Sequence, residues 1–252
     1  MNDIQKNELS FYLPVVIGYA AACFTTWFIY KKAGIWNVSD TYKPKHPWKE
    51  ILLGLAAVLV VFVIGRLYTA GFLIPGRYNP IAWVINNIII YSPVFIVILV
   101  RKHSLNTIWL NKKSIGIKLL AGFLSAFISV SLFLFSRNEW SRWHEVLQKV
   151  LSLDGSTYFL ATFLEGITLA FVFVRLNWLF KLRITLAVPA ILFALAHVPG
   201  MISDGDTWWY ILLMSAVTGT ITVFVLYTCY KSKDIIWIGV VHYVMDAAIR
   251  SF

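Results

Sequence analysis

Apolar residues lie along this chain in long runs that are separated by polar connections. About eight of these runs are candidate helices, and they cover residues 11–30, 50–69, 81–100, 116–135, 157–180, 185–199, 208–230 and 235–250. A helix needs roughly 20 apolar residues to cross a hydrocarbon layer of about 30 Å, and the sixth and eighth runs are shorter than that. The pattern predicts an all-α fold, a polytopic membrane helix bundle of about eight transmembrane helices.

The connection 136–153 has a different pattern. Its apolar residues follow one another at helical spacing, so they fall on one face: Trp140, Trp143, Leu147, Val150 and Leu151. A helix with one apolar face tends to lie in the membrane interface instead of crossing it. We therefore expect an interfacial helix here.

Composition supports a membrane protein with one domain. The chain is 59% hydrophobic and only 13% charged, and its mean hydropathy is +0.73. Soluble domains carry about 25% charged residues. The polar connections are too short to bury a second core, so residues 1–252 are expected to form a single transmembrane domain.

The net charge of +10 follows the topology of the chain. No basic stripe with interleaved aromatic residues is present, so nucleic acid is not an expected partner. Alternate connections instead hold fourteen of the basic residues, and the remaining connections hold seven. The fourteen are Lys31, Lys32, Lys43, Lys45, Lys49, Arg101, Lys102, Lys112, Lys113, Lys118, Lys181, Arg183, Lys231 and Lys233. The positive-inside rule makes these connections cytoplasmic. We therefore expect a multi-pass protein of the cell membrane with both termini extracytoplasmic.

Four ionisable residues lie inside apolar runs. They are Glu165, His197, His242 and Asp246. A charge at the centre of a membrane helix costs roughly 2.5–3.5 kcal/mol, so such residues usually face the bundle interior and serve a function. The expected topology places all four in the outer half of the membrane, and we expect them to converge on one outward-opening cavity.

Each of these residues also has a structural interpretation. His197 could bond a backbone carbonyl near a helix end. His242 and Asp246 are four residues apart, so they share a helix face and could form a hydrogen-bonded pair. Glu165 could pair with Arg175. The shared depth of the four residues favours a catalytic site, in which Glu165 and His197 transfer protons while His242 and Asp246 orient groups or stabilise an oxyanion.

The order of these residues resembles the CPBP family of CAAX-protease and bacteriocin-processing (Abi) intramembrane enzymes. That family has three motifs on separate helices, EExxxR, FxxxH and HxxxN or HxxxD. This chain has FALAH at 193–197 and HYVMD at 242–246, and the resemblance covers a CPBP-like core at about 116–250. The resemblance implies that a Glu of the first motif and His197 activate water, while His242 and Asp246 hold the oxyanion.

The first motif departs from the family pattern. One alignment places Leu164 and Leu169 at a Glu and the Arg of EExxxR, and the other places Gly166 and Ala170 there. Either way, Glu165 is the one remaining carboxylate. Water activation is therefore in doubt, which favours transfer of an acyl group to an amine.

The leading hypothesis is a membrane-embedded enzyme that acts on an amide or acyl bond of a lipid-bearing substrate at the outer leaflet. Its substrate would be a lipid-modified protein or a lipid, and the favoured reaction is acyl transfer in lipoprotein N-acylation, which the resemblance implies for a Gram-positive branch. The alternatives are an intramembrane CAAX-type endopeptidase, a catalytically inactive CPBP relative that serves as a scaffold or immunity protein, and a transporter that uses the buried groups as a proton relay. A further protein partner is unknown.

A zinc ion is an open alternative for this site. Two histidines and a carboxylate, here His197, His242 and Glu165, form a legitimate zinc ligand set with one position left for water. No HExxH motif is present, and the resemblance implies a chemistry that can also run without a metal.

Overall fold

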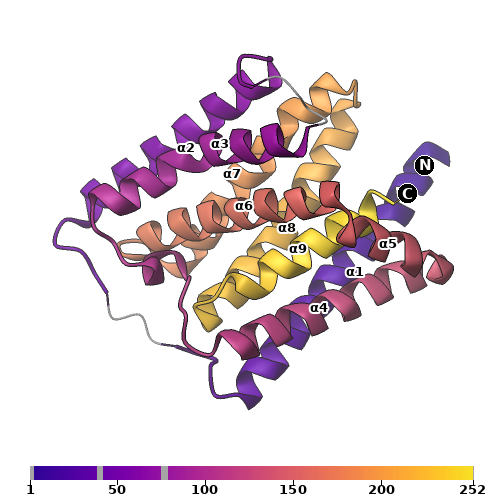
Figure 1. Ribbon diagram of the computed structural model, residues 1–252, viewed down its shortest axis with the longest axis horizontal. Coiled ribbons are helices and arrows are strands. Elements are labelled where there is room, and N and C mark those ends of the chain that lie inside the picture. The colour runs from indigo at the N-terminus through magenta and orange to yellow at the C-terminus, as the bar shows by residue number, and fades with distance from the viewer. Residues whose placement is uncertain (1–2, 39–41, 75–78, 252) are drawn as a thin grey trace.

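The computed structural model describes residues 3–38, 42–74 and 79–251, and in these residues every regular element is a helix (Figure 1). The all-α expectation is therefore confirmed. The elements are α1 (Asp3–Lys32), α2 (Pro47–Thr69), α3 (Pro80–Val100), η1 (Leu105–Ile108), α4 (Ile115–Ser136), η2 (Trp140–Arg142), α5 (Trp143–Leu151), α6 (Leu153–Asn177), α7 (Leu182–Ser203), α8 (Trp208–Ser232) and α9 (Ile236–Ile249).

Among the residues that the structure describes, seven helices are long and apolar enough to cross a membrane, which makes this chain a multi-pass membrane protein. They are α1, in its part Tyr12–Lys32, and α2, α3, α4, α6, α7 and α8. The eighth apolar helix, α9, has only 14 residues, as its short run predicted. It is buried along most of its length, and Trp237, Val241, Met245 and Ala248 are fully enclosed.

The prediction of a short sixth helix is wrong. Helix α7 has 22 residues and continues through Pro199 to Ser203. The Ser203 hydroxyl donates to the Pro199 carbonyl at 2.9 Å, which satisfies a carbonyl of the last turn. Proline is tolerated in membrane helices when such local bonds are available.

The connection 136–153 forms two short helices, η2 and α5, in place of one continuous helix. On α5, Val146 is buried against the bundle, whereas Leu147 and Leu151 are exposed. The short helix thus presents exposed apolar residues at one end of the bundle, and its location in the membrane interface stays a prediction.

Helices α6 and α9 lie at the centre of the bundle (Figure 1). Helix α6 is the most buried of the long helices and packs on α2, α3, α7 and α9. Helix α9 also packs on α4, and α1 packs on α4 and α8. The central helices therefore carry three of the four candidate residues, Glu165, His242 and Asp246.

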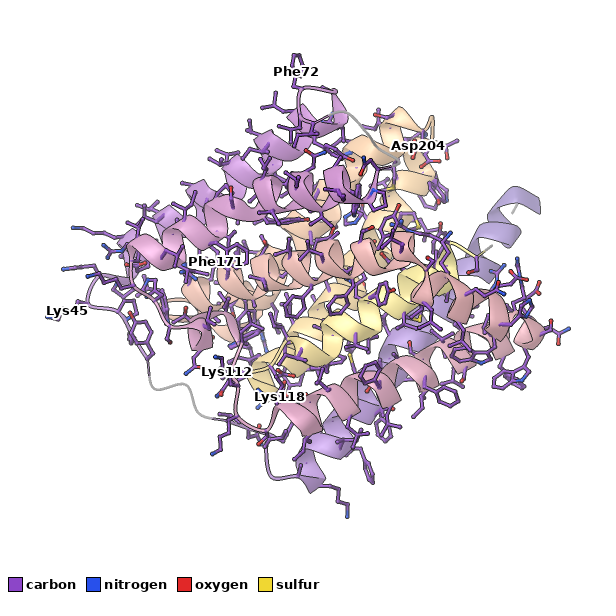
Figure 2. All side chains as sticks on the ribbon, in the orientation of Figure 1. Lys45, Phe72, Lys112, Lys118, Phe171 and Asp204 are labelled. Atoms are coloured by element: carbon purple, nitrogen blue, oxygen red, sulfur yellow. The ribbon has the colours of Figure 1, made fainter. Side chains whose placement is uncertain are left out.

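The connections gather at two ends of the bundle. We call the end formed by residues 33–38, 101–114, 178–181 and 233–235 the basic end, and the end formed by 70–74, 137–142, 204–207 and 250–251 the terminal end. Both chain termini lie at the terminal end (Figure 1). Figure 2 shows Lys45, Lys112 and Lys118 toward the basic end and Phe72 and Asp204 toward the terminal end. The predicted alternation of the connections is therefore present in the fold.

Candidate functional site

Glu165 lies at the middle of α6 and accepts a hydrogen bond from the Tyr91 hydroxyl of α3 at 3.3 Å. It does not pair with Arg175, so that structural interpretation is wrong. Arg175 Nη1 donates to the Phe171 carbonyl at 3.1 Å, and its guanidinium lies 3.4 Å from the centre of the Phe171 ring. Ten residues of helix separate the two charges by about 15 Å. Within the described part of the chain, Glu165 therefore has a hydroxyl partner and no cationic partner.

His197 lies in the second half of α7. Its Nδ1 bonds the Phe193 carbonyl at 2.8 Å, and the Phe193 ring packs against the imidazole edge-on with centroids 4.7 Å apart. A carbonyl can only accept, so Nδ1 carries the hydrogen and Nε2 is the acceptor of the neutral ring. The hydrogen bond to a backbone carbonyl that was expected for His197 is present. It uses only Nδ1, so it orients the ring and leaves Nε2 available to accept a proton.

Glu165 and His197 line the same cavity, which has a volume of about 830 Å³. Its walls come from α2, α3, α6 and α7 and from the residues after α2. Tyr91 and Phe193 also line it, so the hydroxyl that donates to Glu165 and the ring that supports His197 belong to the same cavity. A carboxylate, a hydroxyl and an exposed imidazole thus line one cavity, an arrangement that proton-transfer catalysis can use.

His242 and Asp246 lie beside a second, smaller cavity of about 60 Å³, which His242 lines together with Tyr19 and Gly166. His242 Nε2 is 3.6 Å from Asp246 Oδ1, and Asp246 Oδ2 is 3.9 Å from Arg250 Nη2. The two side chains therefore face each other, as their spacing predicts, but at a distance longer than a hydrogen bond, and Arg250 also approaches the Asp246 carboxylate.

The expectation that all four side chains converge on one cavity is wrong for this conformation. Glu165 faces the large cavity, whereas its neighbour Gly166 faces the small one, because consecutive helical residues point about 100° apart. Helix α6 thus separates His242 from Glu165. The two cavities are nevertheless adjacent, since Leu169 and Phe193 line both.

The depth of the residues follows the expectation in relative terms. Within the apolar span Thr157–Asn177 of α6, Glu165 lies in the half nearer the terminal end. His197 in α7 and Asp246 in α9 also lie nearer the terminal end of their helices.

Tyr19 and Tyr91 are site residues that the sequence did not reveal. Tyr19 of α1 is buried, its ring centroid is 6.5 Å from that of His242, and it interacts electrostatically with both Asp246 and Glu165. Tyr91 bonds Glu165 directly. Tyrosine is common in membrane helices, where it often lies at the interface, so neither position carried a recognisable signal.

The described residues contain no group of three His, Cys, Asp or Glu side chains close enough to hold a metal ion. Glu165, His197 and His242 therefore do not form the zinc set considered from the sequence. His242 faces the other cavity, so the three donors do not point at a common centre.

The second Glu of the EExxxR motif would lie at position 164 or 166, on either side of Glu165. Leu164 is buried, whereas a side chain at Gly166 would enter open space toward the small cavity. Neither position places a carboxylate beside Glu165 in the large cavity.

Comparison with known proteins found no matching family model, no matching curated protein and no matching solved structure. The resemblance to the CPBP family therefore rests on the FALAH and HYVMD motifs alone.

Proposed function

We propose that this protein is a membrane-embedded CPBP-type enzyme that transfers an acyl group to an amine of a lipid-modified protein. The observation that carries the proposal is the shared cavity of Glu165 and His197, which lies among long apolar helices. An intramembrane carboxylate that lines the same cavity as an imidazole is costly to maintain without a function.

The geometry suggests a division of labour. The amine nitrogen attacks the carbonyl carbon of the acyl donor, a C–N bond forms, and the donor C–O bond breaks. His197 Nε2 accepts the proton that the amine loses, and this proton passes to the leaving alcohol oxygen. Glu165 stabilises the protonated imidazole and is itself held by the Tyr91 hydroxyl at 3.3 Å.

His242 and Asp246 have a positioning role in this proposal. Their pair contacts Tyr19, which lies in the field of both Asp246 and Glu165. A change at His242 therefore reaches the large cavity through Tyr19 and through Phe193, which lines both cavities.

Transfer is favoured over hydrolysis because the second carboxylate of the family motif is missing. Leu164 is buried and Gly166 faces the small cavity, so neither sequence neighbour of Glu165 supplies a second carboxylate for activating water. An amine acceptor needs less activation than water because it is the stronger nucleophile.

The test is mass spectrometry of lipoproteins from a deletion strain and from the same strain carrying the wild-type gene. Transfer predicts that the N-terminal lipopeptide loses the mass of one acyl chain in the deletion strain. A change in peptide length would favour the endopeptidase. Identical lipoprotein masses in both strains would contradict the proposal.

A further inference from the structure

Helices α2 and α7 line the large cavity along matching faces. On α2 the lining residues are Val58, Val61, Phe62, Gly65, Arg66, Tyr68 and Thr69. On α7 and the residue that follows it, they extend from Pro189 to Asp204, mostly at the same spacing of three and four. Residues at this spacing form one stripe along a helix. The cavity is therefore elongated, over about 16 Å of α2 and about 22 Å of α7 at helical rise.

The chemistry of the lining changes along this length. Val58, Val61 and Leu192 line the part toward the basic end, whereas Arg66 and Asp204 line the part at the terminal end. Apart from Tyr91, Glu165 and Thr168, the cavity thus presents an apolar channel with a charged mouth. A long apolar chain attached to a polar headgroup has the same polarity profile.

Arg66 is the cation at this mouth. It is exposed, and no ion pair joins it to another residue in the described part of the chain. Arg66 also borders a neighbouring surface hollow together with Ser203, which places Arg66 level with the last turn of α7. An arginine presents a planar set of donors that matches a phosphate group.

We propose that Arg66 binds the phosphate of a glycerophospholipid whose acyl chain occupies the large cavity. The unpaired positive charge at the mouth complements a phosphate, and the apolar walls complement the chain. Asp204 lies at the same mouth and disfavours a headgroup with a second negative charge.

Together with the proposed function, on which this step rests, the site identifies the bound phospholipid as the acyl donor. His197 is six residues before Ser203 on α7, which places it about 9 Å deeper than the mouth. In a glycerophospholipid, the ester carbonyls lie on the chain side of the phosphate, toward His197. The amine attacks one ester carbonyl, the ester C–O bond breaks, and the lysophospholipid leaves as an alcohol that takes the proton from His197.

The binding test uses native mass spectrometry of the purified full-length protein. Phosphatidylglycerol is compared with a diacylglycerol that has the same two chains, so that the two probes differ in the phosphate headgroup. The wild type should prefer phosphatidylglycerol, and Arg66→Gln should lower this preference about 10-fold, which is typical of one hydrogen-bonded charge. Arg183→Gln, at the opposite end of α7, should keep the preference, and inorganic phosphate should not displace the lipid.

Equal binding of the two lipids by the wild type, or an unchanged preference in Arg66→Gln, would overturn the proposed phosphate site. Arg66→Lys should retain part of the preference, which shows that a loss in Arg66→Gln reflects charge and not misfolding.

Activity is read separately, as lysophospholipid release in the presence of a lipopeptide acceptor. Glu165→Gln should bind phosphatidylglycerol like the wild type and release lysophospholipid more slowly by about 10²–10⁴. Binding that depends on Arg66 without any release by the wild type would overturn the assignment of the lipid as donor. Release that does not depend on Arg66 would instead overturn the phosphate site and leave the proposed acyl transfer supported.

Discussion

Glu165 and Gly166 are adjacent on α6, yet they line different cavities. This separation results from helix geometry alone, since successive side chains point about 100° apart. The ionisable residues could be found from the sequence because they interrupt apolar runs. Their partners could not, because the hydroxyls of Tyr19 and Tyr91 belong to residues that fit any membrane helix.

Replacing either of two glycines in the bundle by alanine is expected to change stability in opposite directions. A methyl group at Gly166 would meet no atom within 4 Å, whereas at Gly239 it would lie 2.5 Å from the Phe163 ring. Gly166→Ala should therefore leave the thermal stability equal or slightly higher, because glycine weakens a helix by roughly 0.5–1 kcal/mol. Gly239→Ala should lower the free energy of unfolding by about 1–3 kcal/mol, because the added methyl group overpacks the contact between α9 and α6.

Thermal unfolding of the purified variants, followed by circular dichroism, checks this pair. The expected order of melting temperature places Gly239→Ala below the wild type and Gly166→Ala at or above it. The reverse order would contradict the packing of α9 against α6.

At the scale of elements, a buried polar cluster joins α1, α4 and the turn before α9. Asp234 accepts from the Tyr30 hydroxyl at 2.6 Å and lies 3.5 Å from the Lys118 ammonium. Burial raises the pKa of Asp234 above its ordinary value, while Tyr30 and Lys118 act in the opposite direction. Asp234 also accepts from the backbone nitrogen of Ile236 and so caps α9. The short central helix is thereby fixed at the basic end.

Lys118→Met should destabilise the protein because it leaves the Asp234 carboxyl buried without its cation. Breaking a buried pair in this way costs about 3–5 kcal/mol. The double variant Lys118→Met, Asp234→Asn should recover most of the loss, since an amide can still accept from Tyr30. Lys112→Met serves as the control, because Lys112 is exposed at the same end. Chemical unfolding that shows no difference between Lys118→Met and the control would refute this role for the cluster.

The sequence predicted these elements unevenly. Runs of apolar residues located every long helix, because a helix that crosses a membrane must be apolar along its length. The predicted helix ends were less accurate where side chains form hydrogen bonds to the nearby backbone. Pro199 suggested the end of α7, but the Ser203 hydroxyl bonds its carbonyl and the helix continues. Residues 136–153 form two short helices. Apolar residues on one helical face do not reveal whether the segment forms one helix or two.

At the scale of the whole molecule, both termini lie at the end opposite the basic connections (Figure 1). The sequence predicted that the termini share a side, because eight crossings return the chain to its starting side. Which side this is remains a prediction from the positive-inside rule. The relative placement of α6, α7 and α9 could not be predicted, because apolar patterns do not specify which helices pack together. The single shared cavity was therefore an incorrect expectation.

A reporter fused after Phe252 tests the orientation. Alkaline phosphatase is active only outside the cytoplasm, whereas a green fluorescent protein exported by the general secretion route does not fluoresce. The account predicts phosphatase activity and no fluorescence at this position. A fusion after Lys112, in the basic end, is the matched control and should give the opposite signals. Fluorescence at Phe252 would place the charged mouth of the large cavity on the cytoplasmic side.

The most direct test of the catalytic role of the large cavity is the change Glu165→Gln, read by lipoprotein mass spectrometry. Glutamine keeps the size of the side chain and can still accept from Tyr91, but it cannot stabilise a protonated His197 as a carboxylate does. The deletion strain should carry wild type, Glu165→Gln or the control Glu145→Gln, a change in the surface ion pair of α5 with Arg142. Each strain is sampled over time after induction at matched protein levels.

We expect the control to acylate lipoproteins like the wild type and Glu165→Gln to be slower by about 10²–10⁴, the typical effect of losing one group in acid–base catalysis. Acylation by Glu165→Gln at the wild-type rate would contradict the assignment of this cavity as the active site.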